Sequence, residues 1–535
     1  MIQSDFVPAS RPVLWDVRSC NEWLARAPLA DSRQACAAFL SLLDQLEDAP
    51  PRHVAYLQIL QRLRGPIVIA QEENAKRFTF KPLPLGHVES VAFGQACELW
   101  LALLRAYGRL RRAAIRGRPE LAGSVALLCE RVIECTGELI DAHFLASREV
   151  GEDQWHWLHE AYALAERRGV ADVAIADSRS RRSTSSTCTA AYVRPLMLAL
   201  VHPCGLRERE LAWARQWTHR WAAKVRVGPP PRSERGYCVD LAGATGPLWD
   251  EGPEGQEGSS ATDGGQAAVR HLDFADVGRS IKWRLKKLEE GAQPAELGLG
   301  RGCTQPVAGE LLTMLHSCWT RAPKSRQFPR RVAHAAAELA SGMARIHAAL
   351  GGEVIVTHIR HWDYNRRDTE RIHNVRHAAA FETRHNRTGA EQWNSLDESA
   401  AGFRLRRYGP GERLAQRQLV ALRPRGAQHF ILCELRWLAQ GTDRTLTVGV
   451  RALVGYAQPA SVRPVSEDRS APFSYALTIP VARDLPVSVV LPGGWHQPGR
   501  MLELRAEGQI LRIRLTELLA RGYDFDHARF EVVGP

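Results

Sequence analysis

The sequence has little lysine, no long apolar run and no paired-cysteine motif. Only seven of its 71 basic residues are lysine, and the other 64 are arginine. No apolar stretch approaches the roughly 20 residues that span a bilayer. The first residues have neither the basic flank nor the apolar core of a secretory signal. We therefore expect a cytoplasmic protein of 535 residues with no membrane span.

Motifs for catalysis and metal binding are also missing. The chain has eleven cysteines, an odd number, and no C-x-x-C pair, so neither a zinc site nor a disulfide framework is predicted. It contains no G-x-S-x-G elbow and no G-x-x-x-x-G-K-[ST] loop. Two i, i+3 histidine pairs, His156/His159 and His358/His361, lack further ligands at a recognisable spacing. The sequence therefore predicts no enzyme, no cofactor and no metal site.

Arginine dominates a net charge of +12. Its guanidinium binds phosphates and carboxylates as a two-pronged fork and stacks on flat rings, which fits an anionic or nucleotide partner. The excess is spread along the chain without a concentrated basic tail. That distribution favours a simpler interpretation of the bulk excess, a GC-rich genome that encodes arginine wherever a cation is needed.

The first part of the chain is predicted to be helical. Residues 1–223 should form a bundle or solenoid, because apolar residues recur at helical spacing between breaks rich in proline and glycine. Residues 224–269 have the composition of a linker and contain one strand-like run, GYCVDLAG. Residues 270–324 return to a helical pattern and are predicted to be a helical connector. The expected helices are 32–46, 54–63, 88–112, 121–145, 152–168, 206–223, 274–288 and 309–319.

Short runs that alternate apolar and polar residues follow from about residue 325. Strands at such regular spacing, separated by glycine-rich turns, predict small antiparallel β-barrels. We assign 325–460 to a barrel with a charged, histidine-rich insertion at 358–387, and 461–535 to a β-rich C-terminal segment. The expected fold class is α+β and multidomain. The expected strands are 402–406, 418–423, 430–438, 446–453, 475–479, 487–491, 501–504 and 510–515.

A D-x-S-x-x-G string formed by Asp397, Ser399 and Gly402 is the sharpest local signal. Its glycine permits a tight turn or a close backbone approach, and its acid and hydroxyl can address base edges. Upstream, Arg326 and Arg330 form an R-x-x-x-R string, which Arg331 extends. Taken alone, either string is short enough to occur by chance.

The predicted strands that follow the two strings indicate which kind of domain contains them. The runs LVALR, CELRWLAQGTD and LTVGVRAL reproduce the strand and turn rhythm of a PilZ barrel. Residues 325–456 therefore resemble PilZ domains, the bacterial receptors for cyclic di-GMP, and the whole chain looks like a large multidomain member with a helical N-terminal region. The resemblance implies that the ligand's phosphates and guanine edges are held by the arginines and by the D-x-S-x-x-G turn, namely by Arg326, Arg330, Arg331, Asp397, Ser399 and Gly402.

The insertion at 358–387 holds a second R-x-x-x-R string, Arg367 and Arg371. It lies closer to the D-x-S-x-x-G string and is the alternative source of ligand-binding arginines. We favour Arg326 and Arg330, because Pro329 suits a preformed extended lead-in and acidic neighbours compete for the second pair.

These features predict a cyclic di-GMP receptor that converts second-messenger binding into a protein–protein output. An unidentified protein partner would bind through the helical region. The alternative is a PilZ-like scaffold or adaptor that does not bind the ligand, which the long insertion favours. A nucleic-acid-binding protein is the third hypothesis, and nucleic acid is not an expected partner.

Overall fold

The computed structural model describes residues 13–176, 185–229, 235–250, 268–323, 329–353, 389–465, 471–480 and 487–534. The chain divides into two compact units. The helical unit comprises residues 1–81 and 85–325, and the barrel unit comprises Pro82–Pro84 and Arg326–Pro535.

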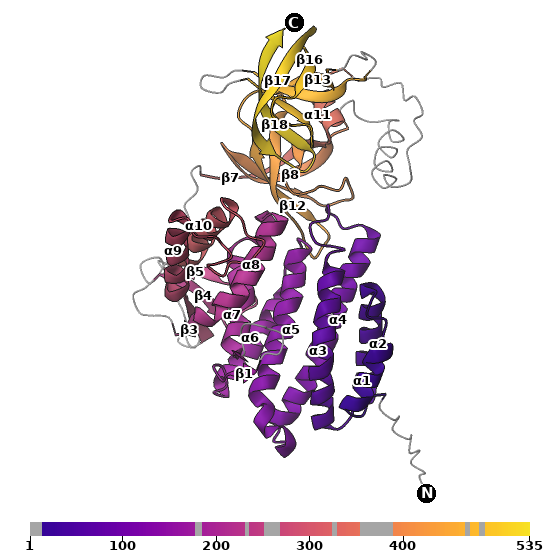
Figure 1. Ribbon diagram of the computed structural model, residues 1–535, viewed down its shortest axis with the longest axis vertical. Coiled ribbons are helices and arrows are strands. Elements are labelled where there is room, and N and C mark those ends of the chain that lie inside the picture. Colours follow the sequence, from indigo (N-terminus) through magenta and orange to yellow (C-terminus); the bar gives the residue numbers. More distant parts are fainter. Residues whose placement is uncertain are drawn as a thin grey trace. The chain divides into compact units, whose positions relative to one another are not determined.

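Long helices that run alongside one another make up most of the helical unit (Figure 1). Its α-helices are α1 (Val17–Arg26), α2 (Ser32–Asp48), α3 (His53–Ala75), α4 (His87–Ile115), α5 (Val125–Leu145), α6 (Glu152–Arg167), α7 (Cys188–Leu200), α8 (Glu208–Trp221), α9 (Ala275–Glu289) and α10 (Val307–Thr320). Short 3₁₀ turns lie at Pro119–Ser124, Pro203–Gly205 and Ala222–Lys224. Along the described residues, none of the helices combines the length and the apolar character needed to cross a bilayer.

Helix α3 is longer than the sequence suggests. The expected helix ends at residue 63, because Gly65 and Pro66 follow, and proline removes an intrahelical hydrogen bond. In the structure α3 continues through Pro66 to Ala75. Ile67, Ala70 and Asn74 extend its buried face, so packing against the bundle outweighs the cost of the proline.

Helices α7 and α10 share one apolar core with the rest of the helical unit. Two indole N–H groups form hydrogen bonds within this core. Trp319 donates to the carbonyl of Met197 at 2.9 Å, and Trp217 donates to the carbonyl of Leu299 at 2.8 Å. The stretch 270–324, expected as a helical connector, thus contributes α9 and α10 to this common core.

A four-stranded sheet lies in the part of the chain where the sequence predicts one strand. Its order is β3 (Arg226–Gly228), β6 (Val269–Asp273), β4 (Gly236–Asp240) and β5 (Leu248–Asp250). Only β4 shows the expected apolar alternation. The other three are three to five residues long and are held by pairing with distant neighbours, a contribution that local sequence does not reveal. A further short pair, β1 (Ile175–Ala176) and β2 (Ser185–Ser186), lies between α6 and α7.

The helical bundle contains a buried group of charges. Arg64 of α3 binds Glu134 of α5 through two nitrogens, with its Nε 2.9 Å from Oε2 and its Nη2 2.6 Å from Oε1. Arg131 bonds to Glu130 and lies 3.5 Å from Glu134. Burial, reinforced by the charge of Glu134, raises the pKa of Glu130 to about 7. Two arginines and two glutamates therefore pair inside the bundle, and their charges balance once Glu130 is ionised above about pH 7.

Glu134→Ala should destabilise the helical unit strongly, because it leaves the buried Arg64 without its carboxylate. Breaking a buried pair on one side typically costs about 3–5 kcal/mol. Calorimetric melting of the full chain measures the change. Arg18→Ala, at the exposed Arg18–Glu22 pair of α1, is the matched control and should shift the melting temperature little. Equal shifts in the two variants would contradict the assignment.

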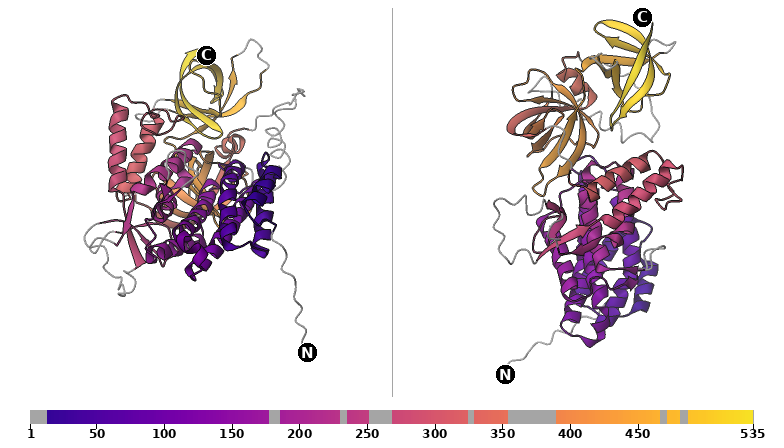
Figure 2. Two further views of the ribbon diagram at one scale, coloured as in Figure 1. Left: turned by 60° about the horizontal axis from the view of Figure 1, so that its bottom comes forward. Right: turned by 90° about the vertical axis from the view of Figure 1, so that its left-hand side faces the viewer.

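The barrel unit consists of two closed six-stranded antiparallel barrels, and the yellow strands of the second wrap into a ring in Figure 2. Barrel 1 has the order β10 (Leu419–Pro424), β11 (Ile431–Gln440), β12 (Leu446–Ala452), β9 (Gly402–Arg407), β8 (Glu391–Ser399) and β7 (Arg331–Ser341). Barrel 2 has the order β13 (Gln458–Pro464), β14 (Ser474–Ile479), β15 (Ser488–Pro492), β18 (Phe525–Gly534), β17 (Gln509–Arg521) and β16 (Met501–Ala506). The C-terminal β segment is thus a complete barrel, and the helical region followed by a β-barrel is confirmed.

The two barrels share an apolar cluster. Helix α11 (Met343–Ala349) follows β7 and packs against β14 of barrel 2. At the same junction Leu419 of barrel 1 donates its backbone N–H to the carboxylate of Asp524, at 3.0 Å. Burial raises the pKa of Asp524 to about 6. A partly buried carboxyl group therefore lies at the contact between the barrels.

Asp524→Asn should stabilise the barrel unit at neutral pH and have little effect near pH 4. The folded protein holds this proton up to about pH 6, whereas the unfolded chain releases it near pH 4. The stability that Asp524 contributes is therefore present below pH 4 and is lost as the pH rises through 6. The gain above pH 6 should be about 1–3 kcal/mol, measured by calorimetry from pH 4 to 8.

Asp443→Asn is the control, because the pKa of Asp443 is shifted in the opposite direction to that of Asp524. Hydrogen bonds from Thr445 lower the pKa of Asp443, so its charged form is the favoured one. This variant should gain nothing as the pH rises. A pH-independent effect of Asp524→Asn would contradict the raised pKa.

Candidate functional site

The D-x-S-x-x-G string lies on a strand hairpin of barrel 1. Asp397 and Ser399 are on β8, and Gly402 begins β9. Ser399 faces Gly402 across the ladder, and its hydroxyl donates to the Gly402 carbonyl at 3.2 Å, which closes the hairpin. Asp397 faces Arg404 in the same ladder. The motif is therefore mostly strand, and only Ala400 and Ala401 form the turn.

Asp397 forms an ion pair with Arg330, as the two strings predict if they meet. The Nη1 of Arg330 donates to Oδ1 of Asp397, and Nη1 of Arg404 lies 3.9 Å from Oδ2. The side chains of Arg330 and Asp397 are 23% and 15% exposed, so the pair is only partly screened by water. The pairing of β8 is irregular next to Asp397 in both of its ladders, the one with β7 and the one with β9. Such bulges redirect side chains next to binding sites.

Gly402 is required by a close backbone approach. A Cβ atom at this position would lie 2.1 Å from the carbonyl oxygen of Val450 on β12. Gly449 is constrained in a similar way, because a Cβ there would lie 2.0 Å from the indole nitrogen of Trp437. Gly402 lets β9 and β12 pack closely, and Gly449 leaves room for the Trp437 ring of β11.

Of the other residues predicted to bind the ligand, the structure describes only Arg331. Arg331 is exposed at the start of β7, opposite Glu398 of β8. Arg326 lies outside the described residues, as do Arg367, Arg371 and the insertion 358–387. The structure therefore brings together Arg330, Asp397, Ser399 and Gly402, and leaves the choice between the two R-x-x-x-R strings as a prediction.

Sequence reasoning missed three charged residues on the same outer face of barrel 1. Arg404 faces Asp397, Arg451 of β12 faces Gly402, and Glu434 of β11 faces Arg451. Directly opposed residues in an antiparallel sheet project to the same side. Arg404 lies two residues after Gly402, so strand periodicity signals its position. Arg451 and Glu434 become neighbours only through the strand order.

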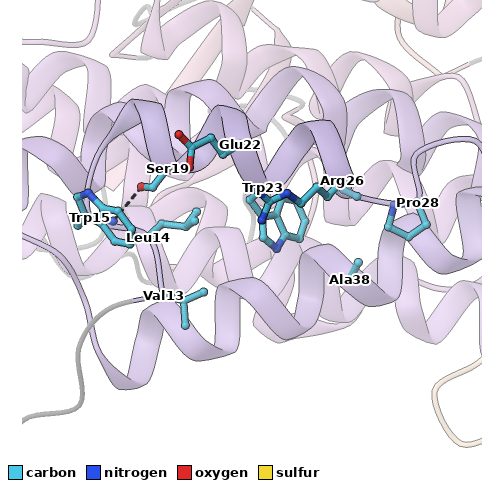
Figure 3. A pocket seen from close by; sticks show the side chains of 10 residues that line it. Val13, Leu14, Trp15, Ser19, Glu22, Trp23, Arg26, Pro28 and Ala38 are labelled. Carbon is cyan, nitrogen blue, oxygen red and sulfur yellow. Dashed lines mark hydrogen bonds between the residues drawn. The ribbon is translucent and has the colours of Figure 1, made fainter.

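The helical unit has a hollow of about 340 Å³ beside α1, lined by Trp15, Trp23 and Arg26 (Figure 3). Its Ser19 is already engaged, because the hydroxyl accepts from the backbone of Trp15 at 3.1 Å and forms part of the helix cap. One arginine beside two indoles does not fit a ligand with two phosphates. Its exposed Trp15 fits a contact surface better.

Histidines and cysteines form no metal centre in the described part of the chain. No group of three or more His, Cys, Asp or Glu there is placed to hold a metal. His159 of the first histidine pair is buried between the Tyr192 hydroxyl, at 2.7 Å, and the Thr245 carbonyl, at 2.8 Å. None of the eleven cysteines forms a disulfide.

Two family profiles match the chain. Residues 18–232 match the N-terminal domain of the cyclic-di-GMP receptor FimW, and residues 460–533 match the FimW C-terminal β-barrel domain. Together they cover more than half of the chain, in the order helical domain and then terminal barrel. Neither match includes the D-x-S-x-x-G barrel. No curated protein matches the sequence.

Gly402→Ala should destabilise barrel 1, because the added methyl group would collide with the Val450 carbonyl and push β9 away from β12. Overpacking of this kind typically costs about 1–3 kcal/mol. Denaturant unfolding of the full chain measures the loss. Gly409→Ala, in the same barrel but with open space around the added Cβ, should be close to neutral. Similar losses in the two variants would show that the close approach is not the cause.

Proposed function

Because the chain belongs to the family of the cyclic-di-GMP receptor FimW, we propose that it binds cyclic di-GMP on the outer face of barrel 1. The observation that carries this location is the meeting of Arg330 with Asp397 beside the Ser399–Gly402 hairpin. Residues 67 positions apart along the chain thus converge at one site, as the resemblance to PilZ domains implies.

The chemistry of these groups matches the ligand. An arginine fork pairs with two phosphate oxygens or with O6 and N7 of guanine. A carboxylate such as Asp397 accepts hydrogen bonds from guanine nitrogens. The resemblance to PilZ domains extends the base contact to Gly402, which is buried here beside the Val450 carbonyl. We assign phosphate and guanine contacts to Arg330 and Arg331, with Arg326 completing the arginine string, and base recognition to Asp397, Ser399 and Gly402.

In the structure the guanidinium of Arg330 donates a hydrogen bond to the carboxylate of Asp397. Ligand binding must therefore exchange this ion pair for contacts to phosphate and guanine, which lowers the net gain in free energy. The same pair supports the alternative function, a scaffold whose barrel no longer takes the ligand. The affinity for cyclic di-GMP distinguishes the two.

We also propose that binding is passed to a protein partner through the helical unit. Residues Pro82–Pro84, which link α3 to α4, belong to the barrel unit. Leu83 pairs with Leu414 through two backbone hydrogen bonds of 2.8 and 2.7 Å, and Arg413 donates to the Pro82 carbonyl. The chain therefore connects two long helices through a segment anchored to barrel 1. The covalent path from α3 through this segment to α4 is the observation that supports this part of the proposal.

Calorimetric titration of cyclic di-GMP into the full chain tests the receptor function. We expect saturable binding at micromolar or lower concentration, and none with GTP or cyclic AMP. Arg330→Ala and Asp397→Asn should each weaken binding at least about tenfold, since a charge-assisted contact contributes about 1.5–3 kcal/mol. Arg326→Ala compared with Arg371→Ala decides which arginine string participates.

Arg423→Ala is the matched control. Like Arg330, Arg423 of β10 forms an ion pair within barrel 1, with Glu338 of β7 at 2.6 Å. This pair lies between β7 and β10, away from the hairpin. Replacing Arg423 should leave the affinity unchanged. If the unaltered chain does not bind cyclic di-GMP at high concentration, the receptor assignment is wrong and the scaffold function takes its place.

A further inference from the structure

A second basic group lies on the outer face of barrel 1, on the other side of Gly402 from Asp397. Glu434 of β11 is 1% exposed, yet three arginines surround its carboxylate. Arg417 Nε lies 3.0 Å from Oε1, while Arg436 Nη1 and Arg451 Nη2 lie 3.3 and 3.2 Å from Oε2. Three guanidinium groups against one carboxylate leave an excess of two positive charges.

Neutralising a buried carboxylate does not require this many cations. Arg417, which is 20% exposed, already binds one carboxylate oxygen at hydrogen-bond distance. Arg436 and Arg451 share the other oxygen, and each uses one terminal nitrogen for it. Their side chains are 47% and 56% exposed, so much of each five-donor fork faces solvent. The carboxylate thus holds two arginines whose side chains are about half exposed.

Strand pairing places this group next to the proposed ligand site. Ser399, Gly402, Arg451 and Glu434 lie opposite one another across β8, β9, β12 and β11. They form one continuous row on the outer face. β8 and β12 flank β9, so Arg451 is two strand spacings, about 10 Å, from Ser399. Gly402 lies between them and carries no side chain that could separate the two halves.

We propose that Arg451 and Arg436, positioned by Glu434, form a second anion contact for the cyclic dinucleotide. This inference rests on the proposed function. A ligand that carries two phosphates and two guanines presents anionic oxygens on more than one side. Arg330 addresses the β7–β8 side, and Arg451 and Arg436 address the β12–β11 side. Arg451 and Arg436 touch the ligand, and Glu434 is a positioning residue.

Calorimetric titration of cyclic di-GMP into full-length variants tests the second contact. Arg451→Ala should raise the Kd about tenfold or more, in line with the loss of one charge-assisted bidentate contact. Arg436→Ala should raise it by a smaller factor. Arg514→Ala is the control, because Arg514 is also about half exposed and bound cross-strand to a glutamate, Glu531 at 2.7 Å, but lies in barrel 2. Its Kd should match that of the unaltered chain.

Arg451→Lys adds a readout that a structural role would not produce. If Arg451 binds a phosphate, the lysine keeps the charge and most of the affinity. If it binds a guanine edge, the lysine loses as much as the alanine, because the fork geometry is lost. Melting temperatures close to that of the unaltered chain would show that Arg451→Ala folds, as expected while Arg417 and Arg436 still hold Glu434.

The outcomes separate the two proposals. If the unaltered chain binds and Arg330→Ala weakens binding, but Arg451→Ala and Arg436→Ala bind within twofold of it, the second contact is wrong and the receptor function stands. If the unaltered chain does not bind, the receptor function is wrong and the second contact falls with it. A parallel loss in Arg514→Ala would show that net charge alone governs affinity, which also overturns the second contact.

Discussion

The approach of Gly402 to the Val450 carbonyl governs the outer face of barrel 1. With no side chain at this position, β9 and β12 lie close enough to align two rows of residues across four strands. One row runs from Asp397 through Arg404 and Gly449 to Trp437, and the other from Ser399 through Gly402 to Glu434. A side chain at 402 would separate the strands and disturb both rows.

Charge neutralisation dominates both units, with different results. In the helical bundle two arginines and two glutamates pair with one another inside the core. On barrel 1 Asp397 binds Arg330 and has Arg404 nearby, and Glu434 binds three arginines. These acids hold the arginines in place while leaving a positive excess at the surface. Such preorganised cations lose less entropy when an anion binds.

Strand and helix patterns could be found from the sequence where packing is regular. The long amphipathic helices and eight of the barrel strands follow from apolar periodicity, and the turn between Ser399 and Gly402 follows from its short motif. Strand β7 was missed because its alanine-rich run has weak strand preference. Helix α3 was expected to end too early because local preference does not include the burial that carries it past Pro66.

The sequence by itself determined the helical and barrel classes, the absence of recognisable catalytic motifs and the residues of the D-x-S-x-x-G string. These are local properties, set by periodicity and residue type. Only the tertiary structure decided that Arg330 binds Asp397 across 67 residues, that Arg451 faces Gly402 and that Glu434 gathers three arginines. Such neighbours depend on strand order and bulges, and these arise from the closure of the barrel, which no local segment encodes.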